Sequence, residues 1–278
     1  MTQIVMLTGA NGFVGRQVYK ALLQADVQIR LVLRHGRGVP GQDDKSVEKV
    51  IRTDDLFTES VEWWAEACTG VDTVIHVAWY AEPGKYLNSP KNIDCLAGTL
   101  SLAHGAVAAG VHRLVGIGTC FEYELGSEWL TIDTPLRPIT PYAGAKAATF
   151  MALSQWLPTE SVEFAWCRLF YLYGEGEDPR RLVPHIRAKL EAGEAAELTS
   201  GTQIRDFMDV SEAGQQIAKV AAGSMTGPIN ICSGKPVAVR QLAEQIADEY
   251  GRRDLLKFGA RPDNLVDPPC VVGVCNRN

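Results

Sequence analysis

The chain has 278 residues, of which 46% are hydrophobic and 22% charged, a balance typical of a globular protein with a substantial core. A formal net charge of −6 argues against a nucleic-acid-binding surface, so we expect no nucleic-acid partner. No apolar run is long enough to cross a bilayer and no signal peptide precedes the first expected strand, which predicts a cytoplasmic protein without a membrane partner.

The first expected elements are a buried strand over residues 4–7, a glycine-rich turn and a helix over residues 13–24. This order is the context that indicates a dinucleotide site. Gly9 permits the tight turn, Gly12 lets the backbone approach a pyrophosphate, and Gly15 lets the helix pack close to the strand. A glycine turn without a ligand is the alternative, which the flanking strand and helix disfavour. The expected cofactor-binding residues of the turn are Gly9, Asn11, Gly12, Phe13, Val14 and Gly15.

The end of the second expected strand, over residues 27–33, bears on the choice of cofactor. A site that prefers NAD usually has an acidic residue here, about 20 residues past the glycines, to bind the ribose 2′-hydroxyl. Arg34 and Arg37 stand here instead, and arginine presents the cationic fork that a 2′-phosphate needs. NADP(H) is therefore the preferred cofactor and NAD(H) a possible one. A solvated basic turn is the alternative.

Further elements alternate along the chain, with strands at 47–52, 71–78, 114–118 and 163–169 and helices at 61–68 and 91–109. This alternation predicts an α/β protein with a doubly wound, parallel Rossmann sheet. Ligands of such sheets bind beyond the carboxyl ends of the strands, where Gly9, Ala78 and Thr119 are expected to lie. His76, inside the fourth strand, is expected to be a satisfied core histidine rather than a catalyst.

A helix that starts at Thr140 and Pro141, typical N-cap and first helical residues, carries the candidate proton donor. Tyr142 and Lys146 are four residues apart and would share one face of this helix. An ammonium beside a phenol favours the phenolate, so we expect Lys146 to lower the pKa of Tyr142 from its ordinary value of about 10. Such a tyrosine can exchange a proton with a carbonyl oxygen or an alcohol. A chance surface pair is the alternative.

The second half of the chain has a different residue pattern. Residues 182–192, 211–222 and 239–250 are expected to be helical, 228–231 to form a strand, and 198–208 to be a polar segment. We expect residues 1–168 to form a NAD(P)-binding Rossmann domain to which 211–232 return, and residues 169–210 and 233–278 to form a substrate-binding lobe. The seven cysteines lack the paired spacing of a metal site, so no metal is expected.

These motifs, taken together, resemble those of the extended short-chain dehydrogenases/reductases that act on sugar nucleotides. Residues 8–15 resemble the glycine turn of that family, and Asp55 with Leu56 resembles the pair that contacts adenine. Residues 76–78 resemble the end of the fourth strand. The remaining matches are Thr119 with Tyr123, Tyr142 with Lys146, Arg168, Tyr173 with Gly174, and the stretch 205–210. The resemblance implies a Rossmann sheet with a small C-terminal substrate-binding lobe.

The chain also departs from this family in informative places. Phe121 stands where the dehydratases and decarboxylases of the family hold an acidic residue, and Glu122, one residue further, should point elsewhere. The histidine that the 3,5-epimerase/reductases place after the Tyr173-Gly174 region is absent there. Cys95 stands where many members have an asparagine, although Asn92 is near.

The resemblance implies a reductase of a 4-keto-6-deoxy sugar nucleotide. Tyr142 would protonate the new alkoxide, Thr119 would orient the carbonyl, and Lys146 would lower the Tyr142 pKa and hold the nicotinamide ribose. An NAD-dependent 4-epimerase is the alternative, and a non-catalytic NADP(H) sensor is a third possibility. The expected substrate-binding residues are Trp79, Thr119, Tyr142, Arg180, Arg181 and Arg205, the last three as forks for a diphosphate. A homodimer formed through the two long helices is a family-level expectation.

Overall fold

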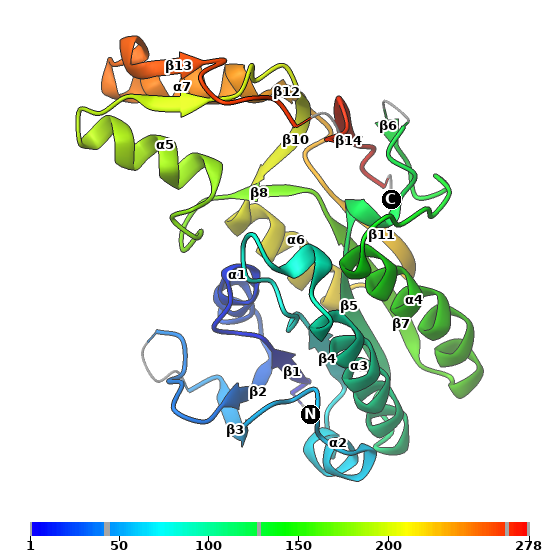
Figure 1. Cartoon of the computed structure of the whole chain (residues 1–278). Coiled ribbons are helices and arrows are strands. Elements are labelled where there is room, and N and C mark those ends of the chain that lie inside the picture. Colours follow the sequence, from blue (N-terminus) through cyan, green and yellow to red (C-terminus); the bar gives the residue numbers. More distant parts are fainter. Residues whose placement is uncertain (1, 42–44, 127–128, 265–266, 277–278) are drawn as a thin grey trace.

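The computed structural model describes residues 2–41, 45–126, 129–264 and 267–276, and a seven-stranded parallel sheet lies at its centre (Figure 1). The strand order is β11-β7-β5-β4-β1-β2-β3. It reverses direction between β1 and β4, so the carboxyl ends of these two strands form the point at which such sheets bind ligands. The bounds are β1 (Ile4–Thr8), β2 (Gln28–Arg34), β3 (Val47–Thr53), β4 (Thr73–His76), β5 (Arg113–Thr119), β7 (Glu163–Leu169) and β11 (Gly227–Ile231).

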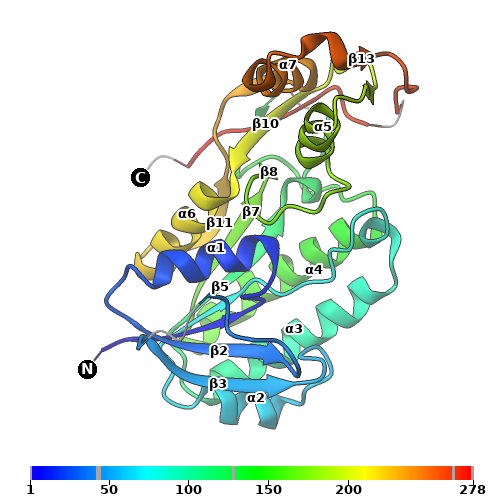
Figure 2. The same ribbon diagram turned by 90° about the vertical axis from the view of Figure 1, so that its left-hand side faces the viewer.

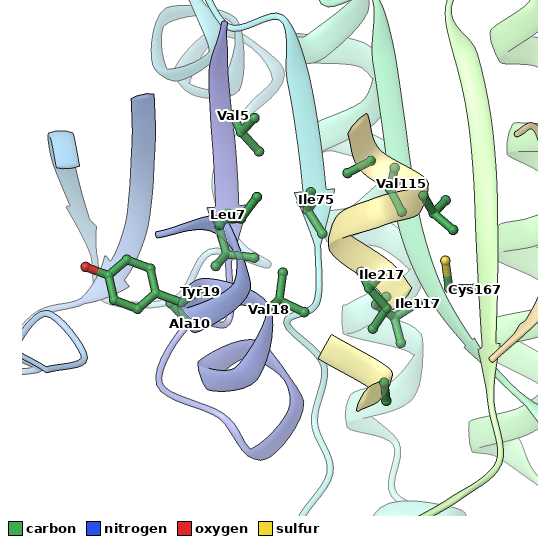
Figure 3. Packing of buried hydrophobic residues seen from close by; sticks show 14 of the residues in the cluster. Val5, Leu7, Ala10, Val18, Tyr19, Ile75, Val115, Ile117, Cys167 and Ile217 are labelled. Atoms are coloured by element: carbon green, nitrogen blue, oxygen red, sulfur yellow. The ribbon is translucent and has the colours of Figure 1, made fainter. Parts of the chain in front are cut away.

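Helices cover both faces of this sheet (Figures 1 and 2). One face carries α1 (Phe13–Leu22) and α6 (Val210–Ala222), and the other carries α2 (Val61–Cys68), α3 (Lys91–Ala108) and α4 (Pro141–Trp156). Every residue of β5 is buried, as a parallel strand covered on both faces requires. Figure 3 shows the core on the first face, where sheet residues such as Leu7, Ile75 and Val115 pack with Val18 of α1 and Ile217 of α6.

A second, smaller unit lies beyond the carboxyl edge of the sheet (Figure 2). Its five-stranded sheet has the order β12-β10-β14-β6, with β8 also paired to β10. Its strands are β6 (Trp129–Leu130), β8 (Tyr171–Tyr173), β10 (Ile204–Asp209), β12 (Pro236–Ala238) and β14 (Cys270–Gly273). The same unit holds α5 (Leu182–Glu191), α7 (Val239–Tyr250) and the strand pair β9 (Ala196–Leu198) and β13 (Leu256–Phe258). Short 3-10 turns are η1 (Tyr86–Asn88), η2 (Cys120–Glu122), η3 (Leu157–Glu160) and η4 (Arg253–Leu255).

The predicted α/β fold with a parallel Rossmann sheet is confirmed. The expected strand at 71–78 is shorter in the structure, since β4 spans only Thr73–His76. The segment 198–208, expected from the sequence only to be polar, contains most of β10 (Ile204–Asp209), the central strand of the second sheet. Its charged residues Arg205 and Asp206 are buried by pairing with groups far away in sequence, which no local pattern reveals.

The division into a dinucleotide domain and a substrate lobe concerns function and stays a prediction. Residues 42–44, 127–128, 265–266 and 277–278 of those ranges, and Met1, lie outside the described part of the chain. Within the part that is described, no helix combines the length and apolar character needed to cross a membrane.

Candidate active site

The glycine turn lies at the switch point, against the end of β4. Gly9 has a φ of +76°, and a side chain there would come within 2.7 Å of the Ala78 nitrogen. A Cβ at Gly15 would overlap the carbonyl oxygen of Gly9. The Gly12 N–H donates to the Gly9 oxygen at 2.9 Å and closes the turn. The structure thus requires glycine at positions 9 and 15, for the two reasons that the sequence suggested.

The start of α1 suits an anionic ligand. Gly12 is the N-cap of α1, and the first turn of the helix contains no acidic residue. A glycine N-cap has no side chain to bond the first N–H groups of the helix, so these groups and the positive end of the helix dipole are available to a phosphate. The turn therefore fits the diphosphate of a dinucleotide, and the role of Asn11, Phe13 and Val14 beside it stays a prediction.

The basic segment after β2 lies next to this turn. Arg34 and Arg37 are both exposed, and the Asn11 side-chain amide donates to the Gly38 carbonyl oxygen at 3.1 Å. This bond ties the segment to the glycine turn. Two cationic side chains therefore lie on a segment fixed beside the predicted phosphate site, which is the place where a 2′-phosphate would need them.

The predicted adenine pair follows β3. Asp55 is exposed and its carboxylate accepts from the Phe57 N–H at 3.1 Å, whereas Leu56 is buried. The backbone turn is fixed by the Thr58 N–H, which donates to the Asp55 carbonyl oxygen at 3.0 Å. The pair thus offers one polar and one apolar group at the rim of the carboxyl edge, and its contact with adenine stays a prediction.

Thr119, Tyr142 and Lys146 come together at the carboxyl end of β5. Thr119 is the last residue of β5, and the Thr140 hydroxyl caps α4 by accepting from the Ala143 N–H at 3.2 Å. This cap starts the helix so that Tyr142 and Lys146 face β5. The Lys146 ammonium donates to the Ile117 carbonyl oxygen at 2.5 Å, and the Thr119 side chain lies near enough to Tyr142 to influence its pKa.

The pKa of Tyr142 contradicts the expectation from the sequence. Burial and the neighbouring Tyr86 raise the pKa of Tyr142 above its ordinary value, and the hydrogen bond with Thr119 only opposes this shift. Lys146 does not act as expected because burial also disfavours its own charge and lowers its pKa to about 7, against the pull of Glu122 and Cys95. The phenol is therefore protonated at neutral pH, as a proton donor must be.

Two aromatic side chains from the segment after β4 cover this pair. The Lys146 ammonium lies 3.7 Å from the centre of the Trp79 ring, and the Tyr86 ring meets the Tyr142 ring edge-on at 4.8 Å. The buried Asn92 holds both: its side-chain oxygen accepts from Trp79 Nε1 at 2.9 Å, and its side-chain nitrogen donates to the Tyr86 carbonyl oxygen at 2.6 Å. Trp79 thus contacts the predicted catalytic lysine, and its role in substrate binding stays a prediction.

His76 is a satisfied core residue, as expected. Its Nε2 lies 3.0 Å from the Thr99 hydroxyl, which itself donates to the Cys95 carbonyl oxygen at 2.7 Å. Nε2 must therefore be the donor, and Nδ1 accepts from the Thr8 hydroxyl at 2.9 Å. Burial lowers the pKa of His76 to about 3, so the ring is neutral. A neutral ring with both nitrogens engaged has no role in proton transfer.

The three arginines predicted for a diphosphate have different neighbours, and their role stays a prediction. Arg181 lies against the site, with its guanidinium carbon 5.9 Å from the centre of the Tyr86 ring. Arg180 is exposed and forms a forked ion pair with Asp178 at 2.8 and 2.9 Å.

Arg205 is buried beneath the second sheet. Its guanidinium lies 2.7 Å from the Asp267 carboxylate and 5.1 Å from the centre of the Tyr171 ring, and it also donates to the Ile204 carbonyl oxygen at 2.8 Å. A ligand diphosphate would therefore share or replace the Asp267 contact, and the role of Arg205 stays a prediction.

Two residues of the site were missed by the sequence reasoning. Tyr86 carries no local signal, because its place depends on how the segment after β4 folds back over α4. Glu122 did carry one, since Thr119-x-x-Glu122 is the pattern of a capping box, which the structure contains. Within the described residues, no three His, Cys, Asp or Glu side chains converge as a metal site would require.

The sequence is similar to those of known proteins. Residues 5–232 match the model of the NAD dependent epimerase/dehydratase family. The dTDP-6-deoxy-L-talose 4-dehydrogenase (NAD(+)) of Aggregatibacter actinomycetemcomitans is 26% identical over 271 residues, which cover 97% of this chain and 98% of that protein. The GDP-6-deoxy-D-mannose reductase of Pseudomonas aeruginosa is 26% identical over 263 residues, covering 89% of this chain and 80% of that protein.

The fold also recurs among solved structures. A UDP-N-acetylglucosamine 4-epimerase from Methanobrevibacter ruminantium M1 superimposes with a TM-score of 0.87, covering 99% of this chain and 90% of that one. The two sequences are 19% identical, so this likeness speaks for the fold alone.

Proposed function

Since that family model covers most of the sequence, the chain belongs to the NAD dependent epimerase/dehydratase family, and from this premise we propose that it is an NADP-dependent reductase of 4-keto-6-deoxy sugar nucleotides. The observation that carries the proposal is that Thr119, Tyr142 and Lys146 gather at the carboxyl end of β5, on the same sheet edge as the turn of Gly9 and Gly15. The names of the two relatives, a 4-dehydrogenase and a reductase of 6-deoxy sugar nucleotides, support this substrate class.

The chemistry requires one hydride and one proton at a carbonyl group. NADPH, when bound over the glycine turn, supplies the hydride to the carbonyl carbon. The Tyr142 hydroxyl gives its proton to the carbonyl oxygen, which becomes an alcohol, and Thr119 donates a hydrogen bond that orients this oxygen. The raised pKa of Tyr142 suits this direction of proton transfer. Lys146, which faces the same space, holds the ribose of the cofactor and places a positive charge near the developing alkoxide.

The residue at position 121 argues against a lyase. The Phe121 ring packs edge-on against Tyr171 at 6.1 Å, and its side chain has no group that moves a proton. Glu122 faces inward, where its carboxylate is fully buried. An elimination needs a carboxyl group in contact with the sugar, and neither residue provides one.

A turnover assay tests the reaction. Purified protein mixed with NADPH and a 4-keto-6-deoxyhexose nucleotide should oxidise NADPH in a one-to-one ratio with formation of a single alcohol epimer. If NAD⁺-loaded protein instead interconverts two 4-epimers without net redox change, the reductase proposal is wrong and a 4-epimerase replaces it. If the cofactor binds and no sugar nucleotide is converted under either condition, the protein is a sensor of the cofactor.

A substitution tests the proposed cofactor preference. Arg34→Asp removes a charge-assisted hydrogen bond to the 2′-phosphate and adds repulsion, so NADPH should bind about 2–3 kcal/mol more weakly. NADH has no 2′-phosphate, and its affinity for the variant is the internal control. Calorimetric titration of both cofactors decides the point. If unmutated protein binds NADH more tightly than NADPH, the proposed preference for NADP(H) is refuted.

A further inference from the structure

Glu122, which follows the catalytic Thr119 by three residues, lies inside the protein beneath the site. Its side chain is fully buried, and its carboxylate accepts hydrogen bonds from the Thr119 backbone N–H at 2.8 Å, Trp166 Nε1 at 3.0 Å and Arg168 Nε at 2.8 Å. The space for this group is made on β5, because a Cβ at Gly118 would overlap both the carboxylate and the Trp166 indole nitrogen. The fold therefore reserves a place for this carboxylate.

The partners of Glu122 extend into a buried network. Arg168 donates to the Tyr123 hydroxyl at 3.0 Å, and its guanidinium carbon lies 4.5 Å from the centre of the Phe150 ring. The Tyr123 hydroxyl donates to the Asn230 side-chain oxygen at 2.7 Å. The Asn230 amide in turn donates to the carbonyl oxygens of Leu130 and Val274, at 2.9 and 3.1 Å. The network thus joins the Thr119 turn to β7, β11 and the second sheet.

Only an acceptor can occupy the position of the Glu122 carboxylate. Its three partners, the Thr119 N–H, the Trp166 N–H and the Arg168 guanidinium, are all donors. A glutamine of the same shape would turn an NH₂ group toward at least one of these donors. A carboxylate is therefore matched to the site, and the capping bond fixes the backbone of Thr119, whose side chain lies near Tyr142.

The charge of Glu122 also favours the charged form of Lys146. Lys146 bonds the Ile117 carbonyl oxygen, two residues before Thr119 on the same strand. The titratable groups around this ammonium are His76 on β4, Cys95 on α3 and Glu122 after β5. His76 is neutral and burial raises the pKa of the Cys95 thiol to about 11, so the carboxyl group that pairs with Arg168, Glu122, is the remaining acid of the three.

We propose that Glu122 is a positioning residue of this active site: its buried carboxylate fixes Thr119 from below and balances the charge of Lys146. The expected effect of Glu122 on kcat rests on the reaction given under the proposed function. The hydrogen-bond and charge effects on Thr119 and Lys146 belong to the protein itself and can be measured without substrate.

The test compares three single variants. Glu122→Gln removes the charge and keeps the shape, Arg168→Gln removes the partner and keeps the acid, and Glu124→Gln removes a partly exposed acid two residues downstream as the matched control. The titration of Lys146 is followed by NMR of protein with ¹³Cε-labelled lysine, with Lys146→Arg to identify the signal. Steady-state kcat and KM are measured on the same samples over a range of pH.

The two network variants should act in opposite directions on Lys146. Glu122→Gln withdraws a stabilising anion, so the Lys146 midpoint should fall by about one pH unit, and kcat should fall at least tenfold with little change in KM. Arg168→Gln leaves that anion without its cation, so the midpoint should stay or rise. Glu124→Gln should change neither. If Glu122→Gln and Arg168→Gln shift the midpoint equally, or if Glu122→Gln leaves both midpoint and kcat unchanged, the proposal is wrong.

If Glu122→Gln does not fold, the double variant Glu122→Gln/Arg168→Gln replaces it in the test, because this variant leaves no unpaired charge in the network. Its Lys146 midpoint must lie below that of Arg168→Gln alone, and an equal midpoint would refute the role of the carboxylate. Because this comparison needs no turnover, it separates failure of the present inference from failure of the proposed reaction.

Discussion

Burial shifts the two central groups of the site toward their neutral forms. It raises the pKa of Tyr142 and lowers the pKa of Lys146 to about 7. Near pH 7 the phenol is therefore protonated and the ammonium is partly deprotonated. The acid form of Tyr142 is thus set by burial, and the nearby Thr119 only opposes this shift.

Removal of this hydroxyl tests the role of Tyr142. Tyr142→Phe keeps the ring that packs against Tyr86 and removes only the proton donor, so kcat should fall by a factor of about 10² or more while cofactor affinity stays nearly constant. The control is Tyr250→Phe, which removes a hydroxyl bonded to Glu191 on α5. A Tyr142→Phe enzyme with near-normal turnover would exclude this residue from the proton transfer.

His76 makes the stability of the protein depend on pH. Its folded pKa of about 3 lies below the ordinary value of 6.5, so the unfolded chain binds a proton first as the pH falls. Stability should therefore decrease below pH 6.5, by about 1.4 kcal/mol for each pH unit down toward the folded pKa. Lys146 does not contribute in this window, since it is protonated in both states below its folded pKa of about 7.

Urea unfolding between pH 6 and pH 4 measures how steeply the free energy of unfolding changes with pH. His76→Asn has no titrating side chain at this position. Its unfolding free energy should therefore change less steeply with pH, by about 1.4 kcal/mol for each pH unit, which corresponds to one proton, whatever its stability at pH 7. His104→Asn, at a position where the histidine stacks on Trp156, serves as the matched histidine control. Equal slopes for His76→Asn and the unmutated protein would contradict the buried neutral state of His76.

At the level of single residues, the sequence predicts the site residues whose partners lie a few positions away in the chain. Tyr142 and Lys146 lie on one helix, and Thr140 caps it, so their shared face followed from spacing. The partners of Arg205 and Glu122 could not be predicted in the same way. Asp267 lies 62 residues from Arg205 and Arg168 lies 46 residues from Glu122, and only the folded chain brings these charges together.

At the level of elements, the glycine turn between β1 and α1 leaves no room for a side chain. A methyl group at Gly15 would overlap the Gly9 carbonyl oxygen and push α1 away from β1. Gly15→Ala should therefore destabilise the fold by about 1–3 kcal/mol and weaken cofactor binding, because the first turn of α1 moves. Thermal unfolding and cofactor titration measure the two effects.

Gly144 of α4 provides the matched control. A Cβ there would meet nothing within 4 Å, so Gly144→Ala should be neutral or stabilising through its better helix propensity. If Gly15→Ala is as well tolerated as Gly144→Ala, the close approach of α1 to the turn is not important for either folding or binding.

The difference between local partners and partners distant in sequence also explains which elements could be predicted. Elements of the Rossmann sheet have strong periodicity, and the expected bounds of α2 and β7 agree with the structure, as do those of α7 in the smaller unit. Strand β10 carries Arg205, Asp206 and Asp209 among its six residues and resembles a surface loop in composition. Asp206 is fully buried because its carboxylate accepts from the N–H groups of Ser233 and Gly234 and from the Ser233 hydroxyl, and this compensation is invisible in the local sequence.

At the level of the whole molecule, two chain crossings connect the large sheet with the smaller one very tightly. β7 ends at Leu169 and β8 begins at Tyr171, so the single buried residue Phe170 separates them. β10 ends at Asp209 and α6 begins at Val210 with no residue between. Hinged enzymes close around ligands by changing the dihedral angles of a few connecting residues, and these two crossings offer almost none.

Because these two crossings are so short, we expect the protein to bind its ligands with little change in overall shape. Small-angle scattering of the protein alone and with saturating cofactor and nucleotide should therefore give the same radius of gyration within error. A clear compaction on binding would contradict this expectation.

The stiffness has a further consequence for selectivity. If the two crossings hold the sheets rigidly, the span from the Tyr142 hydroxyl, where the carbonyl is proposed to react, to Arg205, proposed to meet a diphosphate, is set before any ligand arrives. A preset span favours molecules of one length, because a shorter or longer one cannot reach both ends at once. Discrimination would then act mainly through the distance between the reacting carbon and the phosphates, and much less through the identity of the nucleobase.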